Sequence, residues 1–415
     1  MKRYLDESDA GRRIMQRCNE LACYSVAGEG VTRLYLSPEH KQAADALCLW
    51  MRQAGMDVRL DEVGNVIGRY HASTGGGPYL IIGSHQDSVI HGGKYDGPLG
   101  IVTALDCVAI LHSRQQRFPF GIEVVAFGDE EGTRFKTTLA GSRAVVGTFG
   151  NDLLDARDSS GMSLKEAMIA YGLNPDEVAN AAHPRADVLG YVEVHIEQGP
   201  VLEAEDLPIC GVSAISGQSR SIIKLISAPN HAGTVPMKLR HDPLLAACEI
   251  ALAVERVAHS HEHTVGTVGA INAEPGVMNV IPGSVTMFLD VRSPSDEVRG
   301  HAYSGIEEAA REIAGKRGVD VEINPVLNLK SCPCAPWIVE QMESAIAKCG
   351  VRPVRLPSGA GHDGMAMSNL TAIGMLFVRC RKGISHSPDE SVMVEDVLVA
   401  ARALLCFLEN FEPRG

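Results

Sequence analysis

Two short apolar runs, each leading directly into histidine or acidic residues, constrain the fold of this chain more than any other feature. The runs are YLIIGSH (79–85) and GIEVVAFGDEE (121–131), and residues 100–115 between them have the pattern of a helix. Short continuous apolar runs are typical of strands that are buried on both faces of a sheet. Because strands and helices alternate, the sequence predicts an α/β domain with a largely parallel sheet.

The pattern changes near residue 211, where several strands follow one another around two long helices. The helices are expected over 242–262 and 296–318. This order indicates a separate α+β domain, and the buried α/β pattern returns after it. We therefore predict a discontinuous α/β domain made of residues 1–210 and 328–415. The inserted α+β domain would comprise residues 211–327.

Composition disfavours some classes of function. The 415 residues carry a formal net charge of −13, which disfavours binding to nucleic acid or to an anionic membrane. No apolar run approaches ~18 residues, so no membrane span is expected. Residues 1–25 have the pattern of an amphipathic helix and lack the features of a signal peptide. Eleven scattered cysteines without a CxxC pair indicate reduced thiols, and we expect a cytoplasmic protein.

Polar residues gather where the expected buried strands end. In parallel sheets, sites form at the carboxyl ends of the strands, so we expect these side chains to converge. Histidine and carboxylate side chains together suit a site for two divalent cations. The candidates are His85, Asp87, Asp96, Asp129, Glu130, Glu131, His195 and His386.

Each of these residues also has a plain structural interpretation. A single histidine is more often a core or surface residue than a ligand. Asp96 could cap the helix that follows it, and the acidic run 129–131 could be a solvated loop. The combination is much harder to explain by accident, because three histidines and three acidic motifs all fall at the ends of apolar strands.

Longer motifs around these residues resemble those of the M20-type metallohydrolases, and more narrowly of their hydantoinase/carbamoylase branch. That branch includes N-carbamoyl-L-amino-acid hydrolases, allantoate and ureidoglycolate amidohydrolases and β-ureidopropionases. The resemblance extends from about residue 10 to residue 412, and IEQGP and GGKYDG favour this branch over the peptidases. The motifs are GSHQDSV (83–89), GGKYDGPLG (92–100), DEEGTRF (129–135), HIEQGPVLE (195–203), NHAGTVPM (230–237), SGAGHD (358–363) and GISHSP (383–388).

The resemblance implies a role for each candidate residue. His85 and His195 would bind one metal ion, Glu131 and His386 the other, and Asp96 would bridge the two. Asp87 would orient His85, and Glu130 would be the general base. In the inserted domain, His231 would stabilise the oxyanion. Gln218, Asn279 and Arg292 would contact the substrate, with Arg292 binding its carboxylate, although Arg292 could instead be a surface salt-bridge partner.

The implied activity is hydrolysis of the carbamoyl carbon–nitrogen bond of N-carbamoyl-L-amino acids or related ureido acids such as allantoate. Water activated by two divalent cations would attack, with Zn²⁺ expected first and Mn²⁺, Co²⁺ or Ni²⁺ as alternatives. The inserted domain would be a ferredoxin-like dimerisation or lid domain, and His231 would act across a homodimer. Two other functions stay open: an M20-type aminopeptidase or dipeptidase, and a metal-binding protein without catalysis.

Overall fold

The computed structural model describes residues 5–414, and contacts between Cα atoms divide the chain into two compact units. Unit 1 comprises the described residues up to Ser213, with Cys334–Leu356 and the described residues from Ala360 onward. Unit 2 comprises Ala214–Pro333 and Pro357–Gly359.

Within residues 5–414, the larger sheet has nine strands in the order β1-β2-β4-β3-β5-β15-β6-β13, with β14 paired to β6. Neighbours in the central run β4-β3-β5-β15 are parallel, and the pairs β1-β2, β2-β4, β15-β6 and β6-β13 are antiparallel. The strands are β1 (Asp57–Leu60), β2 (Val66–Tyr70), β3 (Tyr79–His85), β4 (Gly121–Phe127), β5 (Val188–Ile196), β6 (Ile209–Ile215), β13 (Cys332–Pro333), β14 (Arg355–Ser358) and β15 (Ile373–Val378).

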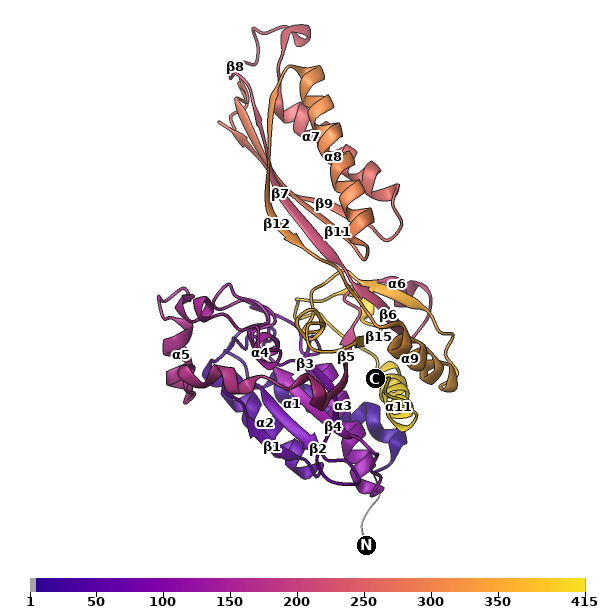
Figure 1. Cartoon of the computed structure of the whole chain (residues 1–415). Helices are drawn as coiled ribbons and strands as arrows, with labels where there is room; N and C mark the ends of the chain where they lie inside the picture. Colours follow the sequence, from indigo (N-terminus) through magenta and orange to yellow (C-terminus); the bar gives the residue numbers. More distant parts are fainter. Residues whose placement is uncertain (1–4, 415) are drawn as a thin grey trace. The chain divides into compact units, whose positions relative to one another are not determined.

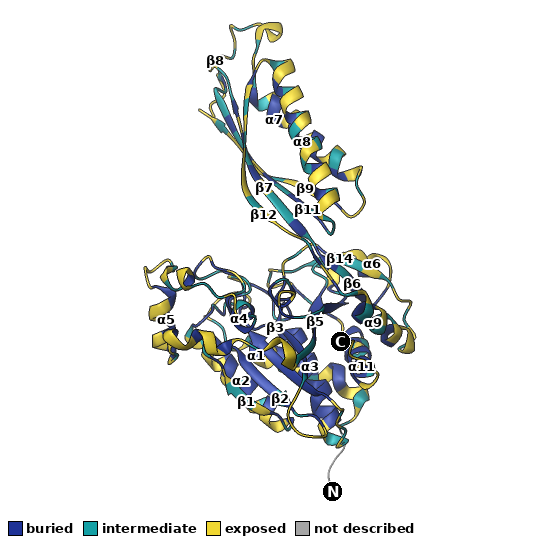
Figure 2. Ribbon diagram, viewed as in Figure 1, coloured by how far each residue is buried: buried dark blue, intermediate teal, exposed yellow. Residues whose placement is uncertain are grey.

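The central strands are buried, as their apolar sequences predict. Every residue of β3, β4 and β15 is buried, and Figure 2 shows dark blue through the middle of unit 1. Helix α3 (Pro98–Ser113) is buried from Pro98 to Leu111, which explains why its sequence is apolar on all sides. The core of unit 1 therefore lies around α3 and the parallel strands.

Helices pack around this sheet, and α2 shows how a capping residue starts one of them. Ser37 accepts a hydrogen bond from the backbone of His40 at the start of α2, with Pro38 in the first turn. Residues 1–4 of the expected N-terminal helix lie outside the described residues. The other helices of unit 1 are α1 (Ala10–Ala22), α2 (Pro38–Gln53), α4 (Ala140–Val145), α5 (Leu164–Tyr171), α6 (Val201–Ala204), α9 (Pro336–Lys348), α10 (Gly364–Met367) and α11 (Val394–Glu409).

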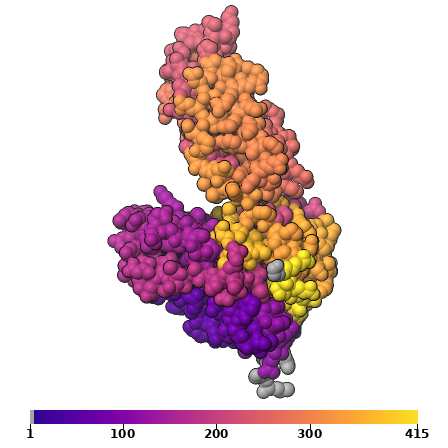
Figure 3. All heavy atoms as spheres, in the orientation of Figure 1, coloured from indigo at the N-terminus to yellow at the C-terminus, as the bar shows by residue number. Residues whose placement is uncertain are grey.

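Unit 2 is an antiparallel sheet with two long helices on one face. In the described part of the chain its main sheet has four strands, in the order β12-β7-β11-β9, and β8 pairs with β10 beyond them. Figure 1 shows α7 and α8 running along the long strands, and Figure 3 shows much of this unit in the orange of residues near 300. The elements are β7 (Gly217–Ile226), β8 (Asn230–His231), α7 (Pro243–His259), β9 (Val265–Glu274), β10 (Val280–Ile281), β11 (Ser284–Ser293), α8 (Asp296–Arg317) and β12 (Asp320–Leu329).

Alternation along β11 separates the two faces of this sheet. Val285, Met287, Leu289 and Val291 are buried in the core that α7 and α8 cover. The residues between them point to the opposite face, where Phe288 is 42% exposed. The predicted fold class, an α/β domain with a mostly parallel sheet and a separate α+β domain, is confirmed. No helix within residues 5–414 has the length and apolar character needed to cross a membrane.

Candidate metal and catalytic site

Parallel strands bring the predicted site residues to one edge of the unit 1 sheet. His85 is the last residue of β3, and His195 lies near the end of β5. Glu130 and Glu131 follow β4, and His386 lies in the segment after β15. Because these strands are neighbours with the same direction, their carboxyl ends meet at one edge.

The carboxylate of Asp96 lies between two sets of possible ligand atoms. Its Oδ1 atom is 3.3 Å from Nε2 of His195 and 3.9 Å from Nε2 of His85. Its Oδ2 atom is 3.1 Å from Nε2 of His386, which is itself 3.8 Å from Oε2 of Glu131. His85, Asp96 and His195 thus form one possible metal-binding group, and Asp96, Glu131 and His386 form another.

Backbone carbonyls orient the two buried histidines toward Asp96. Nδ1 of His85 lies 3.0 Å from the carbonyl oxygen of Asp87, and Nδ1 of His195 lies 3.0 Å from that of Ile196. A carbonyl oxygen only accepts, so Nδ1 of each ring donates and Nε2 keeps its lone pair in the neutral imidazole. Both Nε2 atoms can therefore act as metal ligands.

Gly97 lets the chain turn directly behind His85. Its φ is 84°, in the region that favours glycine. A Cβ atom at this position would lie 2.4 Å from the carbonyl oxygen of His85 and 2.6 Å from its ring. The close approach places Asp96, immediately before Gly97, beside the histidine.

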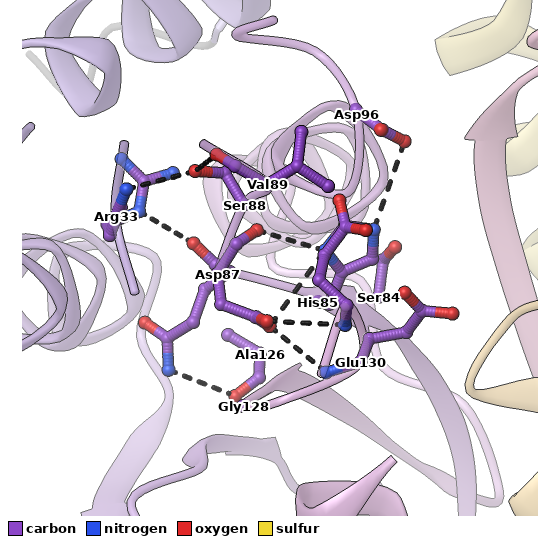
Figure 4. Close-up of polar contacts among 12 residues, drawn as sticks. Arg33, Ser84, His85, Asp87, Ser88, Val89, Asp96, Ala126, Gly128 and Glu130 are labelled. Atoms are coloured by element: carbon purple, nitrogen blue, oxygen red, sulfur yellow. Dashed lines mark hydrogen bonds and ion pairs between the residues drawn. The ribbon is translucent and has the colours of Figure 1, made fainter. Parts of the chain in front are cut away.

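Asp87 contacts His85 differently from the expectation. The backbone oxygen of Asp87 orients the ring, while its carboxylate Oδ1 lies 4.0 Å from Nδ1. The carboxylate instead accepts hydrogen bonds from the backbone N–H groups of Glu130, at 3.2 Å, and Glu131, at 3.3 Å. Figure 4 shows Asp87 between Arg33 and the main chain of Glu130. Asp87 therefore also holds the acidic turn that follows β4.

Buried carboxylates crowd this edge of the sheet. Burial, together with the nearby charge of Glu131, raises the pKa of Glu130 well above its usual range. Burial and the charge of Asp96 raise the pKa of Glu131 to about 8. Burial also disfavours the charged form of Asp96, yet its hydrogen bond with His386 holds its pKa below the usual range. Such a cluster of like charges is stabilised when cations bind.

Two predicted substrate residues, Gln218 and Arg292, form a register pair between β7 and β11 in unit 2. Nε2 of Gln218 donates to Oδ2 of Asp290 at 2.6 Å. Arg292 donates from Nε to Oδ1 of Asp290 at 2.9 Å, and from Nη1 to the carbonyl oxygen of Gly359 at 2.7 Å. In this structure Arg292 therefore forms a salt bridge with Asp290, which is the kind of contact that the alternative interpretation describes.

Of the other two predicted residues in unit 2, His231 lies on β8 and Asn279 lies in the turn immediately before β10. His231 pairs with Val280, and the backbone oxygen of Asn279 accepts from Ala232 at 3.0 Å. Nδ1 of His231 accepts a hydrogen bond from the backbone N–H of Gly233 at 3.0 Å. In the neutral ring the proton is then on Nε2, which is a donor. His231 and Asn279 are exposed.

These two pairs lie at opposite ends of the unit 2 sheet. Gln218 is near the start of β7, and His231 follows its end at Ile226. Eight residues of strand separate Gln218 from Ile226, which corresponds to about 26 Å. Figure 1 shows β8 at the upper end of this unit, beyond the long strands.

Comparisons with known proteins agree with this arrangement. The model of the family described as peptidase family M20/M25/M40 matches residues 81–410. The chain belongs to the M20 family. The N-carbamoyl-L-amino acid amidohydrolase of Geobacillus stearothermophilus is 40% identical over 95% of this chain and 97% of its own length. A probable allantoate deiminase of Oryza sativa subsp. japonica is 38% identical over 92% of this chain and 85% of its own length.

A solved structure supports the same branch of the M20 family. The amidase of the hydantoinase/carbamoylase family from Burkholderia multivorans is 30% identical, with a TM-score of 0.91 over 97% of this chain and 98% of that chain. The resemblance to the hydantoinase/carbamoylase branch is confirmed. This M20 chain is therefore a hydrolase of the carbamoylase/amidase type, which acts on carbon–nitrogen bonds other than peptide bonds.

Three residues that the sequence analysis did not single out hold Asp96 in this M20 chain. Gln198 donates from Nε2 to Oδ1 of Asp96 at 3.1 Å, and Ser385 donates from Oγ to Oδ2 at 3.2 Å. Oε1 of Glu390 accepts from the backbone N–H groups of Tyr95, at 2.8 Å, and Asp96, at 3.1 Å. Gln198 and Ser385 belong to motifs quoted above, so those motifs were the available signal.

A fourth such residue, Glu193, lies beside His195 in the same group of possible ligands. It is fully buried and accepts hydrogen bonds from Oγ of Ser84, at 3.1 Å, and from the hydroxyl of Tyr191, at 3.0 Å. Glu193, His195 and His362 form a further group with ligand atoms close together. Glu193 precedes His195 by two positions, so the alternation of β5 was the available signal.

Proposed function

We propose that this chain hydrolyses the carbamoyl carbon–nitrogen bond of N-carbamoyl-L-amino acids or related ureido acids such as allantoate. The observation that carries the proposal is the position of Asp96, whose two oxygens face different groups of possible ligands with Glu130 and Glu131 beside them. That arrangement suits a bridging carboxylate between two cations. The activities for which the relatives are named supply the substrate class.

The donor set fits two divalent cations. His85 and His195 present unprotonated Nε2 atoms, and Asp96 offers one oxygen to each group. Glu131 and His386 would complete the second group. Imidazole nitrogen and carboxylate oxygen suit Zn²⁺, with Mn²⁺, Co²⁺ or Ni²⁺ as alternatives. When bound, such cations lower the pKa of water toward neutrality and polarise the substrate oxygen.

Glu130 would move the proton in this reaction. Asp87 fixes its backbone, and its side chain lies in one group with His85 and Glu131. A carboxylate beside the attacking water can accept its proton and hold it between the two halves of the reaction. Glu130 would accept the proton of the attacking water and donate it to the leaving nitrogen. The carbamate released would break down to ammonia and carbon dioxide.

Unit 2 would supply substrate binding. Arg292 would bind the substrate carboxylate, because a guanidinium fork matches the geometry of that group, and Gln218 would contact the same substrate. His231 would donate from Nε2 to the oxygen that becomes negative in the tetrahedral intermediate, a role that its hydrogen bond with Gly233 favours. Asn279, next to it, would contact the same substrate.

The distance along β7 supports a homodimer. A ureido acid of amino-acid size is far shorter than the roughly 26 Å between the Gln218 and His231 ends of the sheet. One unit 2 therefore cannot place Arg292 and His231 on the same substrate molecule, and a second copy would supply one of them. The exposed face of α7 carries Leu245 and Leu252, which are 40% and 56% exposed and could pack against that copy.

Two readouts test the proposal: ammonia release for the ureido acids, and release of free amino acids for dipeptides, whose hydrolysis yields no ammonia. The panel comprises N-carbamoyl-L- and D-amino acids, N-carbamoyl-β-alanine, allantoate, ureidoglycolate and a set of dipeptides. We expect turnover of at least one ureido acid and none of the dipeptides. Turnover restricted to the dipeptides would replace the proposal with the aminopeptidase or dipeptidase alternative.

A further inference from the structure

Asp290 connects two predicted substrate-contacting residues, Gln218 and Arg292, to each other. It lies on β11, on the sheet face opposite α7 and α8. Its Oδ1 atom accepts from Nε of Arg292 at 2.9 Å, and its Oδ2 atom accepts from Nη2 of Arg292 at 3.3 Å. The same Oδ2 atom accepts from Gln218 at 2.6 Å and from Nε of Arg220 at 2.7 Å. One carboxylate thus gathers three donor side chains.

Two hydrogen bonds join Arg292 to Asp290, and together they fix the plane of the guanidinium. Rotation about the end of the side chain would break both hydrogen bonds to Asp290 and the one to Gly359. A guanidinium has five N–H donors, and these contacts use three. The remaining two are on Nη1 and Nη2, so a further carboxylate can still bind at that end of the fork.

The charges of this cluster also suit an anionic ligand. Arg220 and Arg292 carry two positive charges against the single negative charge of Asp290. Burial would raise the pKa of Asp290, but the hydrogen bonds from Arg292 and Arg220 hold it below the usual range, so it stays ionised. The side chains of Arg220 and Arg292 are 47% and 30% exposed, which leaves both accessible to a small molecule.

We infer that Asp290 is a positioning residue for substrate binding, which holds Arg292 and Gln218 in the orientation that receives the substrate carboxylate. The inference rests on the proposed function of Arg292. Asp290 would not touch the substrate. It would reduce the conformational freedom that the Arg292 side chain otherwise loses on binding, and so strengthen binding of the free acid without changing the chemical step.

The test measures KM and kcat for an N-carbamoyl-L-amino acid and for its carboxamide, which lacks the negative charge. In Asp290→Ala, we expect KM for the acid to rise on the order of tenfold, with kcat little changed. Asp290→Asn keeps the shape and one acceptor oxygen, so its effect should be smaller. Neither variant should change KM for the carboxamide. Lys224→Gln, which removes an exposed charge from the neighbouring strand β7, should leave both values unchanged.

A double-mutant cycle separates positioning from a general structural effect. In an Arg292→Ala background, Asp290→Ala should add little to KM, because the residue through which it acts is already gone. Equal increases in both backgrounds, or equal increases for acid and carboxamide, would overturn the inference. If Arg292→Ala itself left KM for the acid unchanged, the proposed role of Arg292 would fail. If Arg292→Ala raised it while both Asp290 variants did not, the inference about Asp290 alone would fail.

Discussion

Nε2 of His386 lies 3.1 Å from Oδ2 of Asp96, the oxygen that faces away from His85 and His195. Each oxygen of Asp96 therefore has its own histidine neighbours. Replacing Asp96 should affect two metal positions, whereas replacing His386 should affect one.

Metal content should follow this difference. We expect Asp96→Ala to retain little of either cation and His386→Ala to keep one, as counted by elemental analysis after gel filtration. Extended chelation should abolish ammonia release from the native enzyme, and Zn²⁺ or Mn²⁺ should restore it. Full activity in a preparation verified to be free of metal would rule out the two-cation proposal.

Glu130 and Glu131 are adjacent, but replacing one should have a different effect from replacing the other. Glu130→Gln should lose on the order of 10²–10⁴-fold in kcat, because the proton carrier is gone, while its metal content stays native. Glu131→Gln should lower the occupancy of one cation. Steady-state kinetics and elemental analysis on both variants decide the matter. A Glu130→Gln enzyme with near-native kcat would assign proton transfer to another group.

Two inactive variants should complement each other if His231 acts across the dimer. Glu130→Ala and His231→Ala are dissociated together and reassembled, so that mixed dimers form. In a mixed dimer, one site receives Glu130 from one chain and His231 from the other, and activity should return. Each variant reassembled alone is the control. Mixtures that stay inactive, or a native enzyme that sediments as a monomer, would mean that His231 acts within its own chain or not at all.

Glu390 should matter for metal binding although it is not a proposed ligand. It holds the backbone at Tyr95 and Asp96 and also accepts from Ser385. Glu390→Gln should weaken metal binding about 10–100-fold, as is typical for residues that orient ligands. Competition with a coloured chelator measures this affinity. Glu395→Gln, at the exposed start of α11, serves as the charge control.

Stability should depend on pH through His183, which lies 2.7 Å from Oε1 of the buried Glu123. Burial would lower the pKa of His183, but the hydrogen bond that its Nε2 donates to Glu123 outweighs this effect and raises the pKa above the ordinary value of 6.5. The contribution of this pair to the free energy of unfolding should therefore be full below about pH 6.5. It should be lost as pH rises through the pKa of His183 in the folded protein. The pKa of Glu123 is lowered, so the contribution should also fall at acid pH, below its ordinary value of 4.5.

His183→Gln tests this dependence in metal-free protein, where pH-dependent metal binding does not contribute to stability. The variant should be destabilised by about 1–3 kcal/mol between pH 4.5 and 6.5, and the difference should shrink at higher pH. Urea unfolding at several pH values measures it. A difference that stayed constant up to pH 9 would contradict the assignment of a raised pKa.

The sequence predicted the parallel strands well because their signal is local. The run YLIIGSH is apolar and ends in a histidine, and β3 follows it residue for residue. Convergence of His85, His195 and His386 also followed from the rule for parallel strands. Contacts made through the backbone could not be predicted in this way: the carbonyl oxygen of Asp87, which orients His85, has no side-chain signature.

Contacts between side chains of a strand or of neighbouring strands were the other feature that the sequence did not predict. Arg292 was expected to be available for a substrate, but Asp290 occupies part of its fork. The two residues are separated by one position on β11 and so share a face, which the alternating pattern could have indicated. Placing Gln218 opposite Arg292 required the register of β7 and β11, and register depends on tertiary pairing that one sequence does not reveal.

Gly97 contributes no side chain to the site, yet the path of the chain there leaves no room for one. Any other residue would drive its first carbon atom into His85. A saturation library at position 97 should therefore return almost only glycine among active variants, although Gly97 carries no functional group and its neighbour Asp96 does. For an engineer who wants a wider substrate range, the turn between Asp96 and α3 is the part of the molecule to leave untouched.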